Sequence, residues 1–142
     1  MVKLAFYKGE GNWVDKTIRW WTKSHYSHVE LVINSVWYSS SPRTLEVRGE
    51  KITPNPKHWD YIILEPFNES SLIHLANKEL GKKYDWMGIF FSQFIPLGRE
   101  NPNKWFCSEF CVGMLKDQIK FKHKPSWYSP GKLYEEIKSL GK

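Results

Sequence analysis

The sequence contains few cysteines, which limits the classes of protein to which it can belong. Only two are present in 142 residues, Cys107 and Cys111. They lie four positions apart in a segment with helical periodicity, and helix geometry is poor for joining such a pair in a disulfide. The pattern therefore excludes a disulfide-stabilised secreted scaffold, and reduced thiols fit a cytosolic setting.

Long apolar runs are also missing. The longest, residues 86–98 (WMGIFFSQFIPLG), is too short and too interrupted to span a bilayer. It is typical of a buried helix, or of one that contacts a membrane surface peripherally. The amino terminus lacks a signal-peptide pattern, because Lys3 precedes only a short apolar patch that Lys8 ends. We therefore expect a cytoplasmic protein without a transmembrane segment.

No internal repeat, low-complexity segment or linker divides the chain, so residues 1–142 are expected to form a single domain. A hydrophobic content of 41% with 16% aromatic residues is typical of an ordered globular protein. The net charge of +6 is uneven, because residues 116–142 carry +4 of it, and residues 121–142 form a basic C-terminal extension. No nucleic-acid recognition motif accompanies these lysines, so we interpret them as a solvated face.

Periodicity predicts an α+β protein, with a small antiparallel sheet and helices before and after it. Strands are expected at residues 3–7, 28–33, 36–41, 44–48 and 61–65, with Asn34 and Ser35 as a two-residue turn. Helices are expected from Asn12 to Trp21, from Ser70 or Ser71 to Gly81, from Asp85 to Pro96, and over 129–140. A further helix is expected within KWFCSEFCVGMLKDQIKF, where apolar residues from Cys107 to Ile119 fall at helical spacing.

The segment SHYSHVELVI, residues 24–33, contains the first candidate site residues. Its period of two predicts a strand in which His28 and Glu30 share one face, opposite the face that Val29, Leu31 and Ile33 bury. A strand that begins with an imidazole and a carboxylate side by side raises the question of a chemical role. A histidine judged alone, however, is more often structural.

Cys107 lies in the first turn of the helix predicted within KWFCSEFCVGMLKDQIKF. The exposed backbone N–H groups and the dipole of a helix start favour the thiolate, and a nearby imidazole can accept the proton. Most free cysteines are nevertheless small buried hydrophobes, which is the alternative for Cys107 and the expectation for Cys111. A helix-start cysteine together with the strand-start His28 favours the catalytic interpretation.

YSHVEL followed by FCSEF resembles the permuted papain-like cysteine hydrolases related to the NlpC group, in the YiiX- and YaeF-like branch of bacterial and phage proteins. The lecithin:retinol acyltransferase-like enzymes are similar and share a Tyr-x-His at the corresponding strand. In this branch the histidine precedes the cysteine, as His28 precedes Cys107 here. The resemblance extends to VDKTIRWWTKS and GKKYDW and covers most of residues 12–115, whereas the chain after Phe121 lies outside it.

The resemblance implies a circularly permuted papain-like fold in which Cys107 is the nucleophile, His28 is the general base and no cofactor takes part. A third polar residue should orient the imidazole. With the predicted turn, Ser39 lies opposite Glu30 and Ser41 opposite His28, so the family's usual third position falls within YSSS, where Ser39 is the candidate. Glu30 itself is the other candidate, and we favour it over Ser39. The remaining interpretation makes Glu30 a solvated carboxylate or an ion-pair partner of Arg19, Arg43 or Arg48.

Acyl transfer also needs donors for the oxyanion, and the backbone N–H of Cys107 and the hydroxyl of Tyr26 are candidates. We expect a thiol hydrolase or acyltransferase that acts on an amide or ester. Peptide-like or cell-wall amides are the first expectation for its substrate, and lipid acyl groups are the second.

Two other classes of protein compete with this expectation. A zinc site is disfavoured, because His25 and His28 fall on opposite faces of an extended chain and the two cysteines lack CxxC spacing. A binding module that keeps the fold without activity is the stronger alternative. It is favoured by the serine-only sequence at the family's usual third position.

Overall fold

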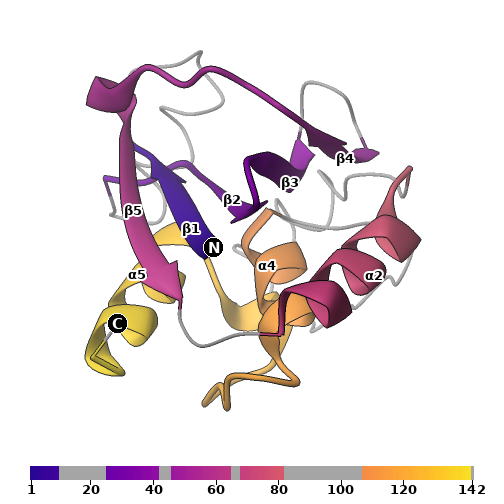
Figure 1. The fold of residues 1–142 in the computed structure, drawn as a ribbon. Helices are drawn as coiled ribbons and strands as arrows, with labels where there is room; N and C mark the ends of the chain where they lie inside the picture. The colour runs from indigo at the N-terminus through magenta and orange to yellow at the C-terminus, as the bar shows by residue number, and fades with distance from the viewer. Residues whose placement is uncertain (10–24, 42–45, 65–67, 82–106, 142) are drawn as a thin grey trace.

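The computed structural model describes residues 1–9, 25–41, 46–64, 68–81 and 107–141. The helices predicted at 12–21 and 85–96 lie outside these residues, as do VDKTIRWWTKS and nearly all of GKKYDW. Within the described part, the fold is α+β, as predicted, with one sheet and three α-helices (Figure 1).

The sheet has five strands in the order β4-β3-β2-β1-β5, and every neighbouring pair is antiparallel. The strands are β1 (Val2–Tyr7), β2 (His28–Ile33), β3 (Val36–Ser41), β4 (Glu46–Glu50) and β5 (Trp59–Leu64). All five were predicted, although β4 extends two residues further along the chain and β5 begins two residues earlier than expected. The strand that carries His28 is therefore the central one.

The turn between β2 and β3 sets the register on which the candidate site depends. Asn34 and Ser35 both have positive φ, 49° and 72°, as a tight two-residue hairpin requires. Asparagine tolerates this left-handed conformation better than most residues do. The strands then pair with Ile33 opposite Val36. The predicted two-residue turn is confirmed, and a one-residue slip would move every side chain of β3 to the other face.

The three described helices are α2 (Glu69–Glu79), α4 (Cys107–Leu115) and α5 (Pro130–Ser139). The predicted start of α2 was wrong, because the N-cap is Asn68 and not Ser70 or Ser71. The Asn68 side chain accepts a hydrogen bond from the Ser71 backbone N–H at 3.1 Å, which satisfies one of the donors exposed at a helix start. Two short 3₁₀ turns, η1 (Pro56–His58) and η2 (Pro125–Trp127), lie in the connections.

Cys107 is the first described residue of α4, which ends at Leu115, although helical spacing was predicted as far as Ile119. The backbone N–H of Ile119 still donates to the Leu115 carbonyl at 2.8 Å. A turn therefore continues the apolar stripe after the helix has ended, and Ile119 remains buried. The helical spacing in the sequence indicated the buried face correctly, whereas the position at which the helix ends depended on the local turn.

The main core lies between the sheet and its helices, because α4 packs against β2 and β3 and also contacts α2 and α5. Its fully buried side chains include Leu4, Phe6, Val29, Leu31, Phe110 and Leu115. A smaller buried cluster covers the other face of the sheet, formed by Ala5, Val32 and Trp37. Strand β2 is thus buried on both faces, and the face that carries Glu30 is not open to solvent.

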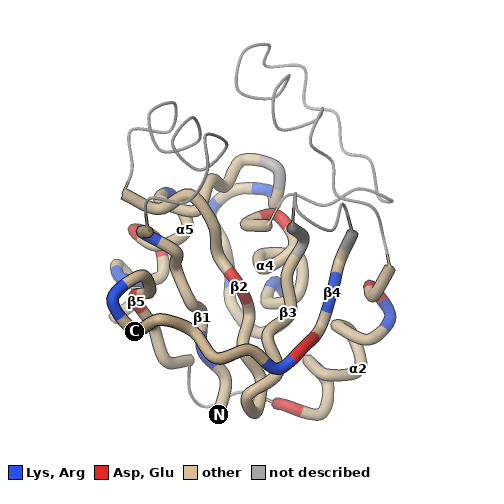
Figure 2. Tube along the Cα trace, turned by 90° about the horizontal axis from the view of Figure 1, so that it is seen from above, with Lys and Arg blue, Asp and Glu red and all other residues tan. Residues whose placement is uncertain are grey.

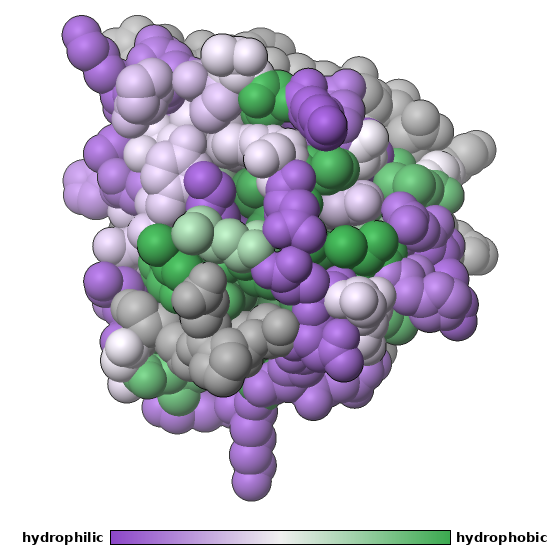
Figure 3. All heavy atoms as spheres, viewed as in Figure 1, coloured by the Kyte–Doolittle hydropathy of each residue, from purple (hydrophilic) through white to green (hydrophobic). Residues whose placement is uncertain are grey.

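The basic C-terminal segment, residues 121–142 in the sequence, is part of the core as far as it is described. Tyr128, Leu133 and Ile137 are fully buried, whereas the lysines of this segment are exposed. In the view of Figure 3, hydrophilic side chains surround smaller apolar areas of the surface. The lysines therefore form the solvated face of an element whose other face is core. None of the described helices is both long and apolar enough to cross a membrane.

The packing of α5 predicts that this segment is needed for stability. Ile137→Ala should lower the free energy of unfolding by about 2–5 kcal/mol, because it leaves a cavity in a close-packed core. Lys138→Ala, on the exposed side of the same helix, should change it by less than about 0.5 kcal/mol. Urea denaturation of both variants checks this, and equal losses would contradict the placement of α5.

Candidate active site

His28 and Cys107 are the first residues of β2 and α4, respectively. One turn along α4, the Sγ of Cys111 lies 4.0 Å from the backbone carbonyl oxygen of Val29, the residue after His28. The helix therefore packs with its start beside the start of the strand. The Cys107 side chain is fully buried, and the His28 side chain keeps 14% of its surface exposed.

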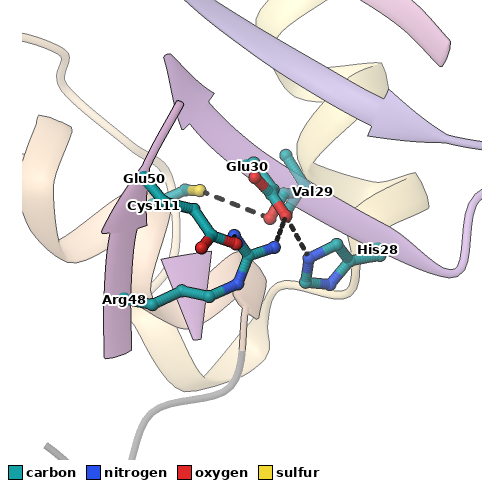
Figure 4. A network of polar contacts seen from close by, with 6 residues as sticks. All are labelled: His28, Val29, Glu30, Arg48, Glu50 and Cys111. Carbon is teal, nitrogen blue, oxygen red and sulfur yellow. Dashed lines mark hydrogen bonds and ion pairs between the residues drawn. The ribbon is translucent and has the colours of Figure 1, made fainter. Parts of the chain in front are cut away.

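Glu30 binds the imidazole from the same strand. Its Oε1 lies 3.1 Å from Nε2 of His28, as the two side chains project together from one face of β2 (Figure 4). An ionised carboxylate can only accept, so Nε2 carries the proton in this contact. The contact therefore selects the tautomer in which Nδ1 of a neutral His28 is free to act as a base. The predicted proximity of His28 and Glu30 is confirmed.

His28 also interacts with Cys107. Burial of the imidazole by itself disfavours the charged form. The charge of Cys107, a hydrogen bond with its side chain, and the hydrogen bond and charge of Glu30 outweigh that effect and raise the pKa of His28 to about 10. The imidazole is therefore protonated at neutral pH, between a sulfur atom and a carboxylate.

Glu30 is buried and ion-paired, which rules out the interpretation of a solvated carboxylate. Only 1% of the residue is exposed, and Nη2 of Arg48 lies 2.7 Å from the same Oε1 that contacts His28. Burial favours the neutral carboxyl, but the hydrogen bond and charge of His28 and the charge of Arg48 lower the pKa of Glu30. Glu30 therefore stays ionised at neutral pH.

Three neighbouring strands contribute to this polar row. Arg48 is paired with Ser39 across β3 and β4, and continuing the register of β2 and β3 places Ser39 opposite Glu30. Figure 2 shows the acidic position of β2 and a basic position of β4 on either side of β3. The Ser39 side chain is fully buried, and neither its Oγ nor Oε2 of Glu30 completes a hydrogen bond within the described residues. The side chain that contacts the His28 imidazole is that of Glu30, and not that of Ser39.

Cys111 has a different environment from Cys107, although both are buried. It lies one turn inside α4, where its Sγ makes a long contact with the Val29 carbonyl oxygen (Figure 4). Burial, followed by the negative charges of Cys107 and Glu30, raises the pKa of the Cys111 thiol well above its ordinary value. The expectation that Cys111 is a buried thiol is confirmed.

The Tyr26 hydroxyl, a predicted oxyanion donor, already donates its hydrogen bond to a carboxylate. The hydroxyl donates to Oδ2 of Asp60 at 2.6 Å, and its ring packs against Phe6 and Tyr134. Burial and the hydrogen bond with Asp60 raise the pKa of Tyr26. A role as oxyanion donor would require the hydroxyl to leave this carboxylate.

A cavity of about 650 Å³ lies between the residues before β2 and the C-terminal segment. Its walls are formed by aromatic and charged side chains, including His25, Tyr26, Lys122, His123, Trp127, Lys132 and Glu135. Neither His28 nor Cys107 belongs to its described lining. The cavity is therefore separate from the Cys107–His28–Glu30 group.

No set of three or more His, Cys, Asp or Glu side chains in the described ranges is arranged to hold a metal ion. No family model and no curated protein matches the chain. A thiol, an imidazole and a carboxylate in sequence are the groups that nucleophilic acyl transfer uses.

Arg48 is the member of this group that sequence analysis did not single out. It was one of three arginines considered as partners of Glu30, and the choice between them depended on the pairing of β3 with β4. The sequence predicts strands at 36–41 and 44–48, but two strands alone do not define the register with which they pair.

The different environments of the two cysteines predict selective alkylation. At pH 7, iodoacetamide should modify Cys107 at least about tenfold faster than Cys111, because the thiolate is the reactive form and Cys111 is held as a thiol. Mass spectrometry of tryptic peptides measures both rates in one sample. In guanidinium the two rates should become similar, and a folded protein in which Cys111 reacts first would contradict the assignment.

The raised pKa of His28 predicts a pH dependence of stability. The pKa is about 10 in the folded protein against an ordinary value of 6.5, so the folded state retains a proton that the unfolded state loses. The resulting stabilisation is complete below pH 6.5 and disappears as the pH rises to about 10. The difference in unfolding free energy between wild type and His28→Asn should therefore shrink over this interval. Urea denaturation at several pH values checks this, and a constant difference would be inconsistent with it.

Proposed function

We propose that the protein is a thiol hydrolase of the permuted papain-like type, in which Cys107 attacks the carbonyl carbon of an amide or ester. The observation that carries the proposal is the position of His28, which interacts with Cys107 on one side and with the buried Glu30 on the other. These are the two partners that a general base of this type requires, a thiol that gives up its proton and a carboxylate that fixes the tautomer.

In the proposed mechanism, the resting site holds a thiolate at Cys107 and an imidazolium at His28. The thiolate adds to the carbonyl carbon, and the carbonyl π electrons move to oxygen to form a tetrahedral oxyanion. The first N–H groups of a helix have no acceptor within the helix, so the backbone N–H of Cys107 is suited to bind that oxygen. As the intermediate collapses, the imidazolium donates its proton to the leaving amine or alcohol and a thioester remains on Cys107.

The second half of the reaction uses His28 as a base. Nδ1 takes a proton from water, the resulting hydroxide adds to the thioester, and the collapse of this intermediate releases the acid and restores the thiolate–imidazolium pair. Glu30 keeps the Nε2 proton in place and stabilises the imidazolium throughout. An acyltransferase would share the first half and differ only in replacing water by another acceptor.

The ionised Glu30 weighs against the alternative of an inactive binding module. That alternative was favoured by the serine-only sequence at the usual third position. The carboxylate on the histidine's own strand supplies the missing acceptor for Nε2 at 3.1 Å. Peptide-like or cell-wall amides remain the proposed substrate class, with lipid acyl groups second.

The test is turnover of a panel of p-nitrophenyl esters and peptide p-nitroanilides. Wild type should release chromophore over many turnovers and carry the acyl group on the Cys107 peptide. Cys107→Ala and His28→Ala should each lose about 100-fold or more of this rate, since nucleophile and base act together. Cys111→Ala should keep most of it. Turnover that survives in Cys107→Ala, or acylation of a different residue, would overturn the proposal.

A further inference from the structure

Glu30 receives two cationic side chains on a single oxygen. Nε2 of His28 lies 3.1 Å from Oε1, and Nη2 of Arg48 lies 2.7 Å from the same atom. Oε2 has no hydrogen-bond partner within the described residues. Both His28 and Arg48 therefore hold the Glu30 carboxylate in its orientation, and Arg48 does so from β4, two strands away.

Arg48 reaches Glu30 by crossing β3 at Ser39. The three residues occupy one cross-strand row, in which Arg48 pairs with Ser39 and the register of β2 and β3 sets Ser39 opposite Glu30. Adjacent strands lie about 4.8 Å apart, so the guanidinium must pass over the middle position of this row. A serine at that position is small enough to let it pass. The conspicuous serine at position 39 thus has a structural explanation that does not require it to orient His28 itself.

The Arg48 guanidinium has a second carboxylate partner on its solvent side. Nη1 of Arg48 makes an ion pair with Glu50, while Nη2 makes the pair with Glu30 (Figure 4). The two nitrogens of the planar group thus bind two separate carboxylates, one buried and one exposed. The buried charges then alternate along the row, with Arg48 positive, Glu30 negative and His28 positive beside Cys107.

We propose that Arg48 is a positioning residue of this site, which holds the Glu30 carboxylate so that its Oε1 keeps Nε2 of His28 protonated and Nδ1 directed to Cys107. The inference rests on the proposed thiol chemistry, and it adds a fourth residue that touches neither the thiol nor a substrate. Its effect on Cys107 passes through Glu30 alone. A guanidinium that served only to hold β4 on the sheet would act on stability, independently of which residue stands at position 30.

A double-mutant cycle on the alkylation rate of Cys107 tests this, because it needs no knowledge of the substrate. The variants are Arg48→Met, Glu30→Gln and the two combined, each measured with iodoacetamide over a range of pH. Arg48→Met should slow alkylation at neutral pH roughly tenfold when Glu30 is present, a size usual for coupling within a buried network. In the Glu30→Gln background the same change should have little further effect. The unfolding free energy of each variant is measured in parallel.

Glu50→Gln is the matched control. It removes the exposed partner of Arg48 and leaves the Arg48–Glu30 contact available, so alkylation should stay within about twofold of wild type, as expected for a surface pair. Arg48→Gln serves as the second variant if Arg48→Met is too unstable, because it keeps a hydrogen-bond donor while removing the charge. Arg48→Gln should slow the alkylation of Cys107 when Glu30 is present and have little further effect when it is combined with Glu30→Gln.

The outcomes separate this inference from the proposed function. If wild-type Cys107 reacts no faster than Cys111 and His28→Ala leaves its rate unchanged, the proposed thiol chemistry itself fails. If those two tests succeed but Arg48→Met and Arg48→Gln slow alkylation equally in the Glu30 and Glu30→Gln backgrounds, Arg48 acts independently of Glu30 and the inference is wrong. An unchanged rate in both Arg48 variants would also overturn it.

Discussion

A carboxylate that is buried in a sheet must be neutralised, and the placement of Glu30 makes this requirement central to the structure of the site. An isolated buried charge costs several kcal/mol, which a single imperfect contact does not offset. Glu30 meets the requirement with His28 from its own strand and Arg48 from two strands away. The pairing of β2, β3 and β4 must therefore be correct for the ion pairs to form, and slippage of one strand would leave a charge unpaired.

The same constraint links the sheet to the helix that follows it. His28 faces Cys107 because α4 packs its apolar stripe on β2, with Cys111 against the Val29 backbone. Two cysteines one turn apart thereby acquire different chemistry. The one inside the helix is surrounded by core and stays a thiol, and the one at the helix start adjoins an imidazolium. Packing that would be ordinary for a core helix thus gives the two sulfur atoms different surroundings.

Several features of the site were predictable from local patterns. The alternation in HVELVI placed His28 and Glu30 on one face, and Asn34–Ser35 predicted a tight turn that puts Ser39 opposite Glu30. The helical spacing of Cys107, Phe110 and Cys111 predicted that both cysteines lie on one helix with a buried face. The N-cap of α2 and the end of α4 were predicted wrongly, because neighbouring polar residues compete for these positions with small differences in free energy.

The sequence by itself therefore determined which residues share a face, where the hairpin turns and that both cysteines lie on one helix, since each depends on contacts between residues close in the chain. Only the tertiary structure decided that the face carrying Glu30 is buried, that Arg48 binds it, and that the Tyr26 hydroxyl is taken by Asp60. A period of two defines the two faces of a strand but not what covers each of them. The segments that cover each face are distant in the chain, and their positions are set only when the whole core packs.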